Sequence, residues 1–138
     1  MLRIGNTILV GQSTRTDDNG FSQLAKIVEP FGFRVVRVNV RGCLHLKTAC
    51  TAIDDRTLLI NPDWIETQNL VGFELISIPP EEPFAANTLP FRDSILIPAS
   101  MTKTESMLLA KGYDVRTLDI SEFSKAEAGL TCLSLLLN

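Results

Sequence analysis

The sequence repeats a short pattern at a constant interval. A glycine followed by an aromatic residue, a charged residue and a β-prone run occurs three times, and the glycines are 40 residues apart. The copies are Gly32-Phe-Arg-Val-Val-Arg-Val38, Gly72-Phe-Glu-Leu-Ile-Ser-Ile78 and Gly112-Tyr-Asp-Val-Arg-Thr-Leu118. Glycine commonly ends a helix, and β-branched and aromatic residues favour strands. The pattern therefore predicts three similar units, each closing with a glycine turn and a strand.

Each glycine closes a segment in which a hairpin and a helix are expected. The hairpins are predicted at residues 2–11, 48–60 and 87–97, with turns at Gly5-Asn6, Asp54-Asp55 and Arg92-Asp93. Such turns between β-rich runs are typical of hairpins. Helices are predicted at residues 21–31, 62–66 and 102–110, from apolar spacing or a proline or threonine at the start. The last helix would carry a capping box formed by Thr102 and Glu105.

These elements predict a single α/β domain over residues 1–138. It would contain three ββαβ units at about residues 1–40, 41–80 and 81–120, and a closing strand at 129–137. A length of 138 residues fits one domain, and a hydrophobic content of 45% is enough to form a core. The net charge of −3 and the lack of a basic run argue against binding to nucleic acid or to an anionic membrane surface.

The cysteine and histidine content argues against several kinds of site. Three cysteines without CxxC spacing and one histidine do not make a zinc-binding set, so neither a metal nor a cofactor is expected. The N-terminus lacks the apolar core of a signal peptide, and no apolar run reaches transmembrane length. With the odd number of thiols, these features predict a cytoplasmic protein with reduced cysteines.

Few residues in this sequence are candidates for catalysis. His45 is the single histidine, and Cys132 lies in the apolar run at 129–137 that predicts a buried strand. One hypothesis makes Cys132 a nucleophile and His45 its acid/base partner. The other makes Cys132 an ordinary buried thiol, the commonest fate of a free cysteine. The residues alone leave both hypotheses open. Cys43 and Cys50 are predicted to be core or sheet thiols.

Other notable residues have plain structural interpretations. Asp54-Asp55 is expected to form a turn, and Asp17 is expected to lie in a loop or to cap a helix. Trp64 is predicted to cap the second helix against the sheet. Arg15, judged alone, is a solvated loop charge.

Three stretches, in this order, resemble the guanidino-group-modifying (amidinotransferase) superfamily, and within it the dimethylarginine dimethylaminohydrolase family. They are Gly11-Gln-Ser-Thr-Arg-Thr16, Gly42-Cys-Leu-His-Leu-Lys47 and Lys125-Ala-Glu-Ala-Gly-Leu-Thr-Cys132. The resemblance covers essentially the whole chain and corresponds to the C-terminal portion of a family member. It implies a pentein-like fold, here a partial α/β-propeller drawn from a ring of five ββαβ units around a pseudo-fivefold axis.

The resemblance also implies roles for four residues. Cys132 matches the family nucleophile, His45 the general acid/base, and Arg15 the arginine that binds the substrate α-carboxylate. Ala126 stands where the family contacts substrate through main-chain groups. The implied reaction converts a methylated arginine or arginine to citrulline through a covalent thiouronium on the cysteine, with the histidine protonating the leaving amine and then activating water.

The chain departs from the family pattern in what it lacks. Two units are missing, and with them the acidic residues that orient the histidine and hold the guanidinium. A buried guanidinium without a carboxylate is costly. The alternative function is therefore a catalytically inactive, truncated oligomeric binding or scaffold protein that retains the Cys/His pair. Exposed sheet edges and the C-terminal strand would favour assembly into a homo-oligomer.

Overall fold

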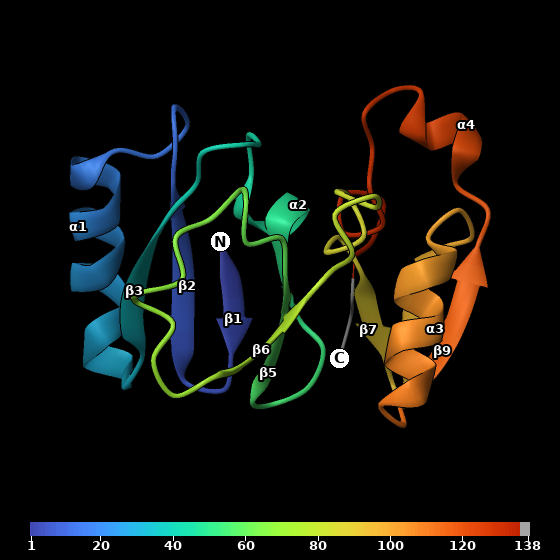
Figure 1. Cartoon of the computed structure of the whole chain (residues 1–138). Coiled ribbons are helices and arrows are strands. Elements are labelled where there is room, and N and C mark those ends of the chain that lie inside the picture. Colours follow the sequence, from blue (N-terminus) through green and yellow to red (C-terminus); the bar gives the residue numbers. More distant parts are fainter. Residues whose placement is uncertain (136–138) are drawn as a thin grey trace.

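The computed structural model describes residues 1–135, which form three small sheets side by side (Figure 1). Each sheet is an antiparallel hairpin whose second strand also pairs in parallel with a third. The strands are β1 (Leu2–Ile4), β2 (Thr7–Gln12), β3 (Arg34–Asn39), β4 (Cys50–Ala52), β5 (Thr57–Ile60), β6 (Glu74–Ser77), β7 (Leu89–Phe91), β8 (Ser94–Pro98) and β9 (Asp114–Leu118). The α/β class is confirmed.

The predicted turns are confirmed, and so is the role of the three repeated glycines. Leu2 pairs with Leu9 across the first hairpin, and equivalent antiparallel pairs flank the other two turns. Asp54 accepts hydrogen bonds from the backbone N–H groups of Arg56 and Thr57, which fixes the second turn. The repeated glycines have φ values of 82°, 94° and 90°. This left-handed backbone favours glycine because it has no Cβ.

Two of the three predicted helices form. The helices are α1 (Asp18–Val28), continued by the short 3-10 helix η1 (Glu29–Phe31), then α2 (Leu46–Ala49), α3 (Thr102–Ala110) and α4 (Ser121–Ser124). Asp17 caps α1 by accepting from the Gly20 N–H, as expected. The helix predicted at 62–66 is wrong: residues 62–64 form a turn, and Ile65 forms a β-bridge with Val40. There the Asn61 side chain accepts from the Asp63 N–H, a local bond that competes with helix formation.

The capping box predicted at the start of α3 is also wrong. Met101 occupies the cap position and makes no side-chain cap bond. Instead, Glu82 from the loop after β6 accepts from the N–H groups of Lys103 and Thr104, both at 2.8 Å. It also accepts from the Thr104 hydroxyl at 2.6 Å. A residue distant in sequence therefore caps this helix.

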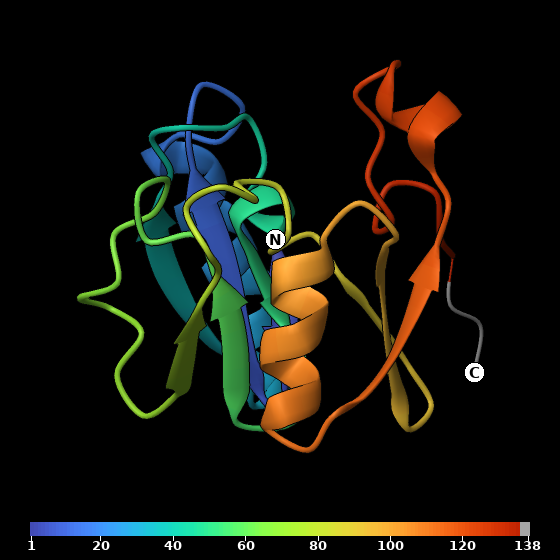
Figure 2. The ribbon, with the colours of Figure 1, turned by 45° about the vertical axis from the view of Figure 1, so that its right-hand side comes forward.

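The core consists of two apolar clusters that meet at β5. One contains Leu9, Val38 and Leu58 and lies between the first two sheets. The other contains Leu59 and Leu108 and joins the second sheet to α3 and the third sheet (Figure 2). All four residues of β5 are buried, as is usual for a strand covered on both faces. In contrast, most residues of β9 are exposed.

The closing strand predicted at 129–137 is wrong over the described part of that range. Residues 130–132 form a turn, and the N–H groups of Cys132 and Leu133 donate to the Gly129 carbonyl at 3.0 and 3.2 Å. This local bonding replaces the ladder that a strand needs, and no described strand pairs with the segment. Residues 136 and 137 lie outside the described residues. The sheets are not closed, and a ring about a pseudo-fivefold axis stays a prediction.

Within residues 1–135, none of the helices combines the length and the apolar character needed to cross a bilayer.

Candidate active site

The carboxyl ends of the parallel strand pairs lie at one end of the molecule, at the top of Figures 1 and 2. Loops that follow β3, β5, β6, β8 and β9 surround a cavity of about 690 Å³ there. Ligands of open α/β sheets bind at this end, where loops rather than ladders determine the surface. The cavity is therefore the candidate active site.

His45 is placed at the cavity by the loop that follows β3. It is the N-cap residue of α2, with an extended backbone. Its carbonyl accepts from the Thr48 N–H at 3.0 Å and from the Cys43 thiol at 3.3 Å, so the main chain at this point is well fixed. The imidazole is on the exposed side of this turn and has no hydrogen-bond partner among residues 1–135. It is free to reach a ligand.

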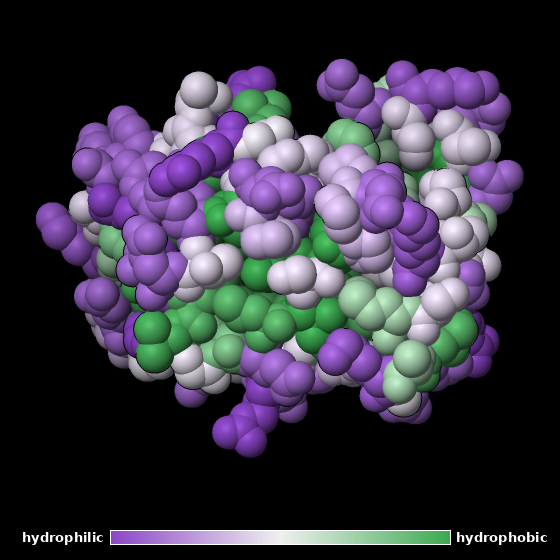
Figure 3. Space-filling view, in the orientation of Figure 1, coloured by the Kyte–Doolittle hydropathy of each residue, from purple (hydrophilic) through white to green (hydrophobic). Residues whose placement is uncertain are grey.

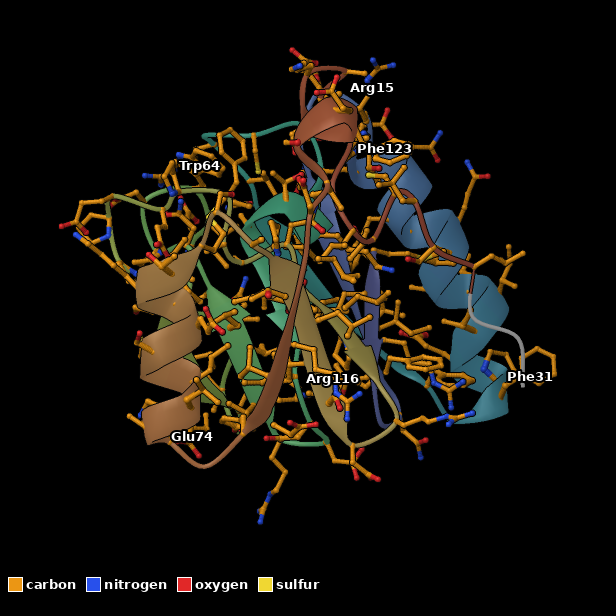
Figure 4. All side chains as sticks on the ribbon, turned by 90° about the vertical axis from the view of Figure 1, so that its right-hand side faces the viewer. Arg15, Phe31, Trp64, Glu74, Arg116 and Phe123 are labelled. Atoms are coloured by element: carbon orange, nitrogen blue, oxygen red, sulfur yellow. The ribbon has the colours of Figure 1, made fainter. Side chains whose placement is uncertain are left out.

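Trp64 forms one wall of the cavity instead of capping a helix, which corrects the sequence prediction. A Cβ added at Gly42 would lie 2.0 Å from the Trp64 ring, so only glycine lets the indole lie against the His45 loop. The Phe84 ring packs edge to face on Trp64 with centroids 5.0 Å apart. In Figure 4, Trp64 lies in the upper part of the view, toward the end of the molecule at which Arg15 and Phe123 are also labelled.

Cys132 lines the same cavity and is exposed, contrary to the buried strand position predicted for it. The other two cysteines differ from it. Cys50 is completely buried, and burial raises the pKa of its thiol to about 12, as fits the predicted core thiol. Cys43 is half-buried, and burial raises the pKa of its thiol while a hydrogen bond with the His45 backbone partly offsets this. Cys132 is thus the most accessible of the three thiols.

The approach to Cys132 begins at a turn after α4. Ala126 and Glu127 both line the cavity. The Ala128 N–H donates to the Phe123 carbonyl and the Glu127 N–H to the Ser124 carbonyl, at 3.2 and 3.0 Å. Glu127 has a φ of 59°, in the left-handed region that usually takes glycine at this position of a helix end. Among the described lining residues, Glu127 supplies the one carboxylate.

Arg15 is the one predicted site residue that does not line the cavity. It is exposed in the loop after β2, at the same end of the molecule as Phe123 (Figure 4). Ser13 ties this loop to the His45 loop, since its hydroxyl donates to the Leu44 carbonyl at 3.1 Å and accepts from the Arg15 N–H at 3.2 Å. The structure thus brings His45, Ala126 and Cys132 together and leaves Arg15 beside their loops.

Asn87 is a polar residue of the cavity that was not identified as a site residue from sequence. Asn87 is only 7% exposed, lines the cavity and accepts from the Thr131 N–H at 3.1 Å. The sequence around it, Ala85-Ala-Asn87, gives no indication of a contact with Thr131. Trp64, Phe84 and Glu127 were also missed as lining residues, because turns far apart in sequence bring them together.

Comparison with known proteins shows which proteins this chain resembles. No family model matches it. It is 30% identical to the N(G),N(G)-dimethylarginine dimethylaminohydrolase of Pseudomonas aeruginosa over 98% of this chain and 53% of that protein. The enzyme of the same name from Streptomyces coelicolor is 40% identical over 97% of this chain and 51% of its own length.

The solved structures agree with the sequence matches. A structure of the Pseudomonas aeruginosa enzyme superposes with a TM-score of 0.87 over 97% of this chain and 52% of its own. An amidinotransferase of the saxitoxin pathway from Microseira wollei shares the fold at 16% identity, with a TM-score of 0.84 over 94% of this chain and 44% of its own. The chain spans about half the length of the curated relatives it matches. Over that half it is similar in sequence and fold to the dimethylarginine dimethylaminohydrolases, the family that its three sequence stretches resemble.

Proposed function

We propose that the chain carries the thiol and the imidazole of a guanidino-group hydrolase, and that it converts dimethylarginine or arginine to citrulline. The observation that carries this proposal is the cavity shared by His45, Ala126 and Cys132, which come from loops after different strands. Cys132 is the nucleophile and His45 the general acid/base. Arg15 binds the substrate carboxylate at the mouth, because its planar fork suits a carboxylate. The main chain at Ala126 contacts the substrate.

Two solved relatives support these assignments. The Pseudomonas aeruginosa enzyme with a cysteine replaced by serine is complexed with citrulline. A dimethylarginine dimethylaminohydrolase with a histidine replaced by glycine, also 30% identical to this chain, forms an adduct with S-methyl-L-thiocitrulline. That histidine and that cysteine are separated in sequence by the same number of residues as His45 and Cys132.

The proposed mechanism needs only these two side chains for the covalent steps. The Cys132 thiolate attacks the guanidinium carbon and forms a C–S bond. The C–N bond to the leaving amine breaks as the His45 imidazolium gives that nitrogen its proton, which leaves a thiouronium on Cys132. Neutral His45 then takes a proton from water, whose oxygen bonds to the same carbon. The C–S bond breaks, the thiolate returns and the ureido product leaves.

The test is citrulline release from dimethylarginine and from arginine. We expect measurable turnover that is lost in Cys132→Ser and in His45→Ala. Cys43→Ser is the matched control, because Cys43 lines the same cavity but has no role in the mechanism. Turnover that survives in Cys132→Ser, or that is lost equally in Cys43→Ser, would refute the assignment.

An inactive oligomeric binding or scaffold protein is the second candidate. Glu127 is the one carboxylate among the described lining residues, so a guanidinium in the cavity has little charge to pair with. The exposed β9 and its exposed Leu118 offer a surface for a second copy. Binding of citrulline without turnover of dimethylarginine or arginine would favour this candidate.

We also propose that the chain forms a homo-oligomer in the cytoplasm. Exposed apolar side chains include Val71 and Leu75, on β6 and in the turn before it. The face of the molecule on which β6 lies in Figure 1 carries an apolar band in Figure 3. Apolar patches and open sheet edges recruit partners, and three free thiols fit a reducing compartment. Light scattering tests the assembly, and a monomer mass of 15.2 kDa would refute it.

A further inference from the structure

We propose that Asn87 is the positioning residue of the thiol loop, defined as residues 129–132, and that its free amide N–H group is a hydrogen-bond donor to the cavity beside Cys132. The inference rests on the proposed function only in giving Cys132 the reactive role. Asn87 stands at the end of the loop that joins β6 to β7, far from the thiol loop in sequence.

Asn87 is held firmly and in turn holds the thiol loop. Its side chain is nine-tenths buried, and its backbone N–H donates to the Phe84 carbonyl at 3.0 Å. Its side-chain oxygen accepts from the Thr131 N–H at 3.1 Å, across 44 residues of sequence. Thr131 directly precedes Cys132, so this bond fixes the peptide that leads into the thiol-bearing residue.

Gly129 makes the contact possible. A Cβ added at Gly129 would lie 2.2 Å from the Asn87 side-chain nitrogen and 2.7 Å from its Cγ. These distances are far below van der Waals contact, so only glycine allows the amide to lie against the loop. The backbone of Gly129 is not in the left-handed region. Space, rather than backbone conformation, is what requires glycine at this position.

The bond to Thr131 also determines which way the amide points. A backbone N–H must meet the oxygen, so the NH₂ group takes the other position. No hydrogen-bond partner for that NH₂ exists among residues 1–135, and the side chain lines the cavity. A donor that lines the cavity without a protein partner is available to a ligand with an acceptor. Such an acceptor is the thiolate of Cys132 or the ureido oxygen of a citrulline-like product.

Two variants separate the holding role from the donor role. Asn87→Asp keeps an oxygen for the Thr131 N–H and replaces the NH₂ with a second carboxylate oxygen. Asn87→Ala removes both groups. Gly129→Ala perturbs the same contact from the thiol loop, because the added methyl group would displace the Asn87 amide. Asn69→Ala is the control, since Asn69 makes one amide-to-backbone bond, to the Arg37 carbonyl, away from the cavity.

Two measurements follow the loop and the thiol without any turnover. Amide hydrogen exchange at Thr131 reports the holding bond, and the pH profile of Cys132 alkylation by iodoacetamide, resolved by peptide mass spectrometry, reports the thiolate. We expect Asn87→Ala and Gly129→Ala to accelerate Thr131 exchange by about tenfold, the effect of losing one hydrogen bond. We expect Asn87→Asp to retain protection and to raise the alkylation midpoint by about one pH unit, because a nearby carboxylate disfavours a thiolate.

The outcomes are distinct. Unchanged Thr131 exchange in both Asn87→Ala and Gly129→Ala would overturn the holding role, and so would an equal change in Asn69→Ala. An unchanged Cys132 midpoint in Asn87→Asp with Thr131 still protected would overturn the placement of the amide beside the thiol. If both effects occur but citrulline is not produced, the positioning role stands and the proposed hydrolase function fails.

Discussion

Removal of the Glu82 carboxylate is expected to destabilise the fold much more than removal of its neighbour. Glu82 is 8% exposed and accepts three hydrogen bonds at the start of α3, from two backbone N–H groups and the Thr104 hydroxyl. Loss of a helix cap costs about 1 kcal/mol. A buried donor left unpaired costs roughly 1–3 kcal/mol, and Thr104 is completely buried. We therefore expect Glu82→Ala to lower the free energy of unfolding by about 2–4 kcal/mol.

Urea denaturation at one fixed protein concentration measures this change, and Glu81→Ala is its matched control. Glu81 is exposed and pairs with the Lys103 ammonium in a surface ion pair. Surface pairs contribute little, so Glu81→Ala should leave the urea midpoint nearly unchanged. Glu82→Gln should give an intermediate loss, because one amide oxygen still accepts while the charge at the helix start is removed. Equal losses in Glu81→Ala and Glu82→Ala would refute the capping argument.

Three further predictions concern single side chains. Gly42→Ala should displace Trp64, the only tryptophan, and shift its fluorescence, because the new methyl group would lie 2.0 Å from the ring; an unchanged spectrum contradicts this. Cys50 should resist alkylation until the protein unfolds, since burial raises its pKa to about 12; labelling of native protein at neutral pH contradicts this. Partial burial raises the pKa of Asp54, but hydrogen bonds from Arg56, Thr57 and Tyr113 outweigh it and leave the pKa lowered. This carboxylate therefore stabilises the fold above its unfolded pKa of about 4, and the contribution is lost as pH falls through the lower folded value. Asp54→Asn should flatten the acid side of the stability–pH curve, and an unaltered slope contradicts this.

Features fixed by neighbouring residues were predictable from the sequence. Gly32 and its two counterparts require a positive φ, and Asp54 makes bonds to residues two and three positions ahead, so these turns follow from local chemistry. The helix predicted at 62–66 failed because the Asn61 side chain offers the chain a competing turn. The capping box predicted for α3 failed because Glu82, some twenty residues upstream, caps the helix instead.

The candidate site was predictable only in part. Family resemblance selected His45 and Cys132, and the structure places both at one cavity. Local apolarity predicted a buried strand around Cys132, yet a strand forms only where a partner strand supplies the ladder, and composition does not reveal that. Asn87 was not identified because its importance lies in a contact with Thr131 that only the folded chain creates.

The burial of β5 on both faces has a consequence for how this chain unfolds. Leu58 belongs to one apolar cluster and Leu59, the next residue, to the other. Separation of β5 from either neighbouring strand would expose apolar side chains of both clusters to water at once. The repeated units are therefore not independent modules that melt one after another, as in a linear array. We expect a single cooperative transition in which the middle unit couples the outer two.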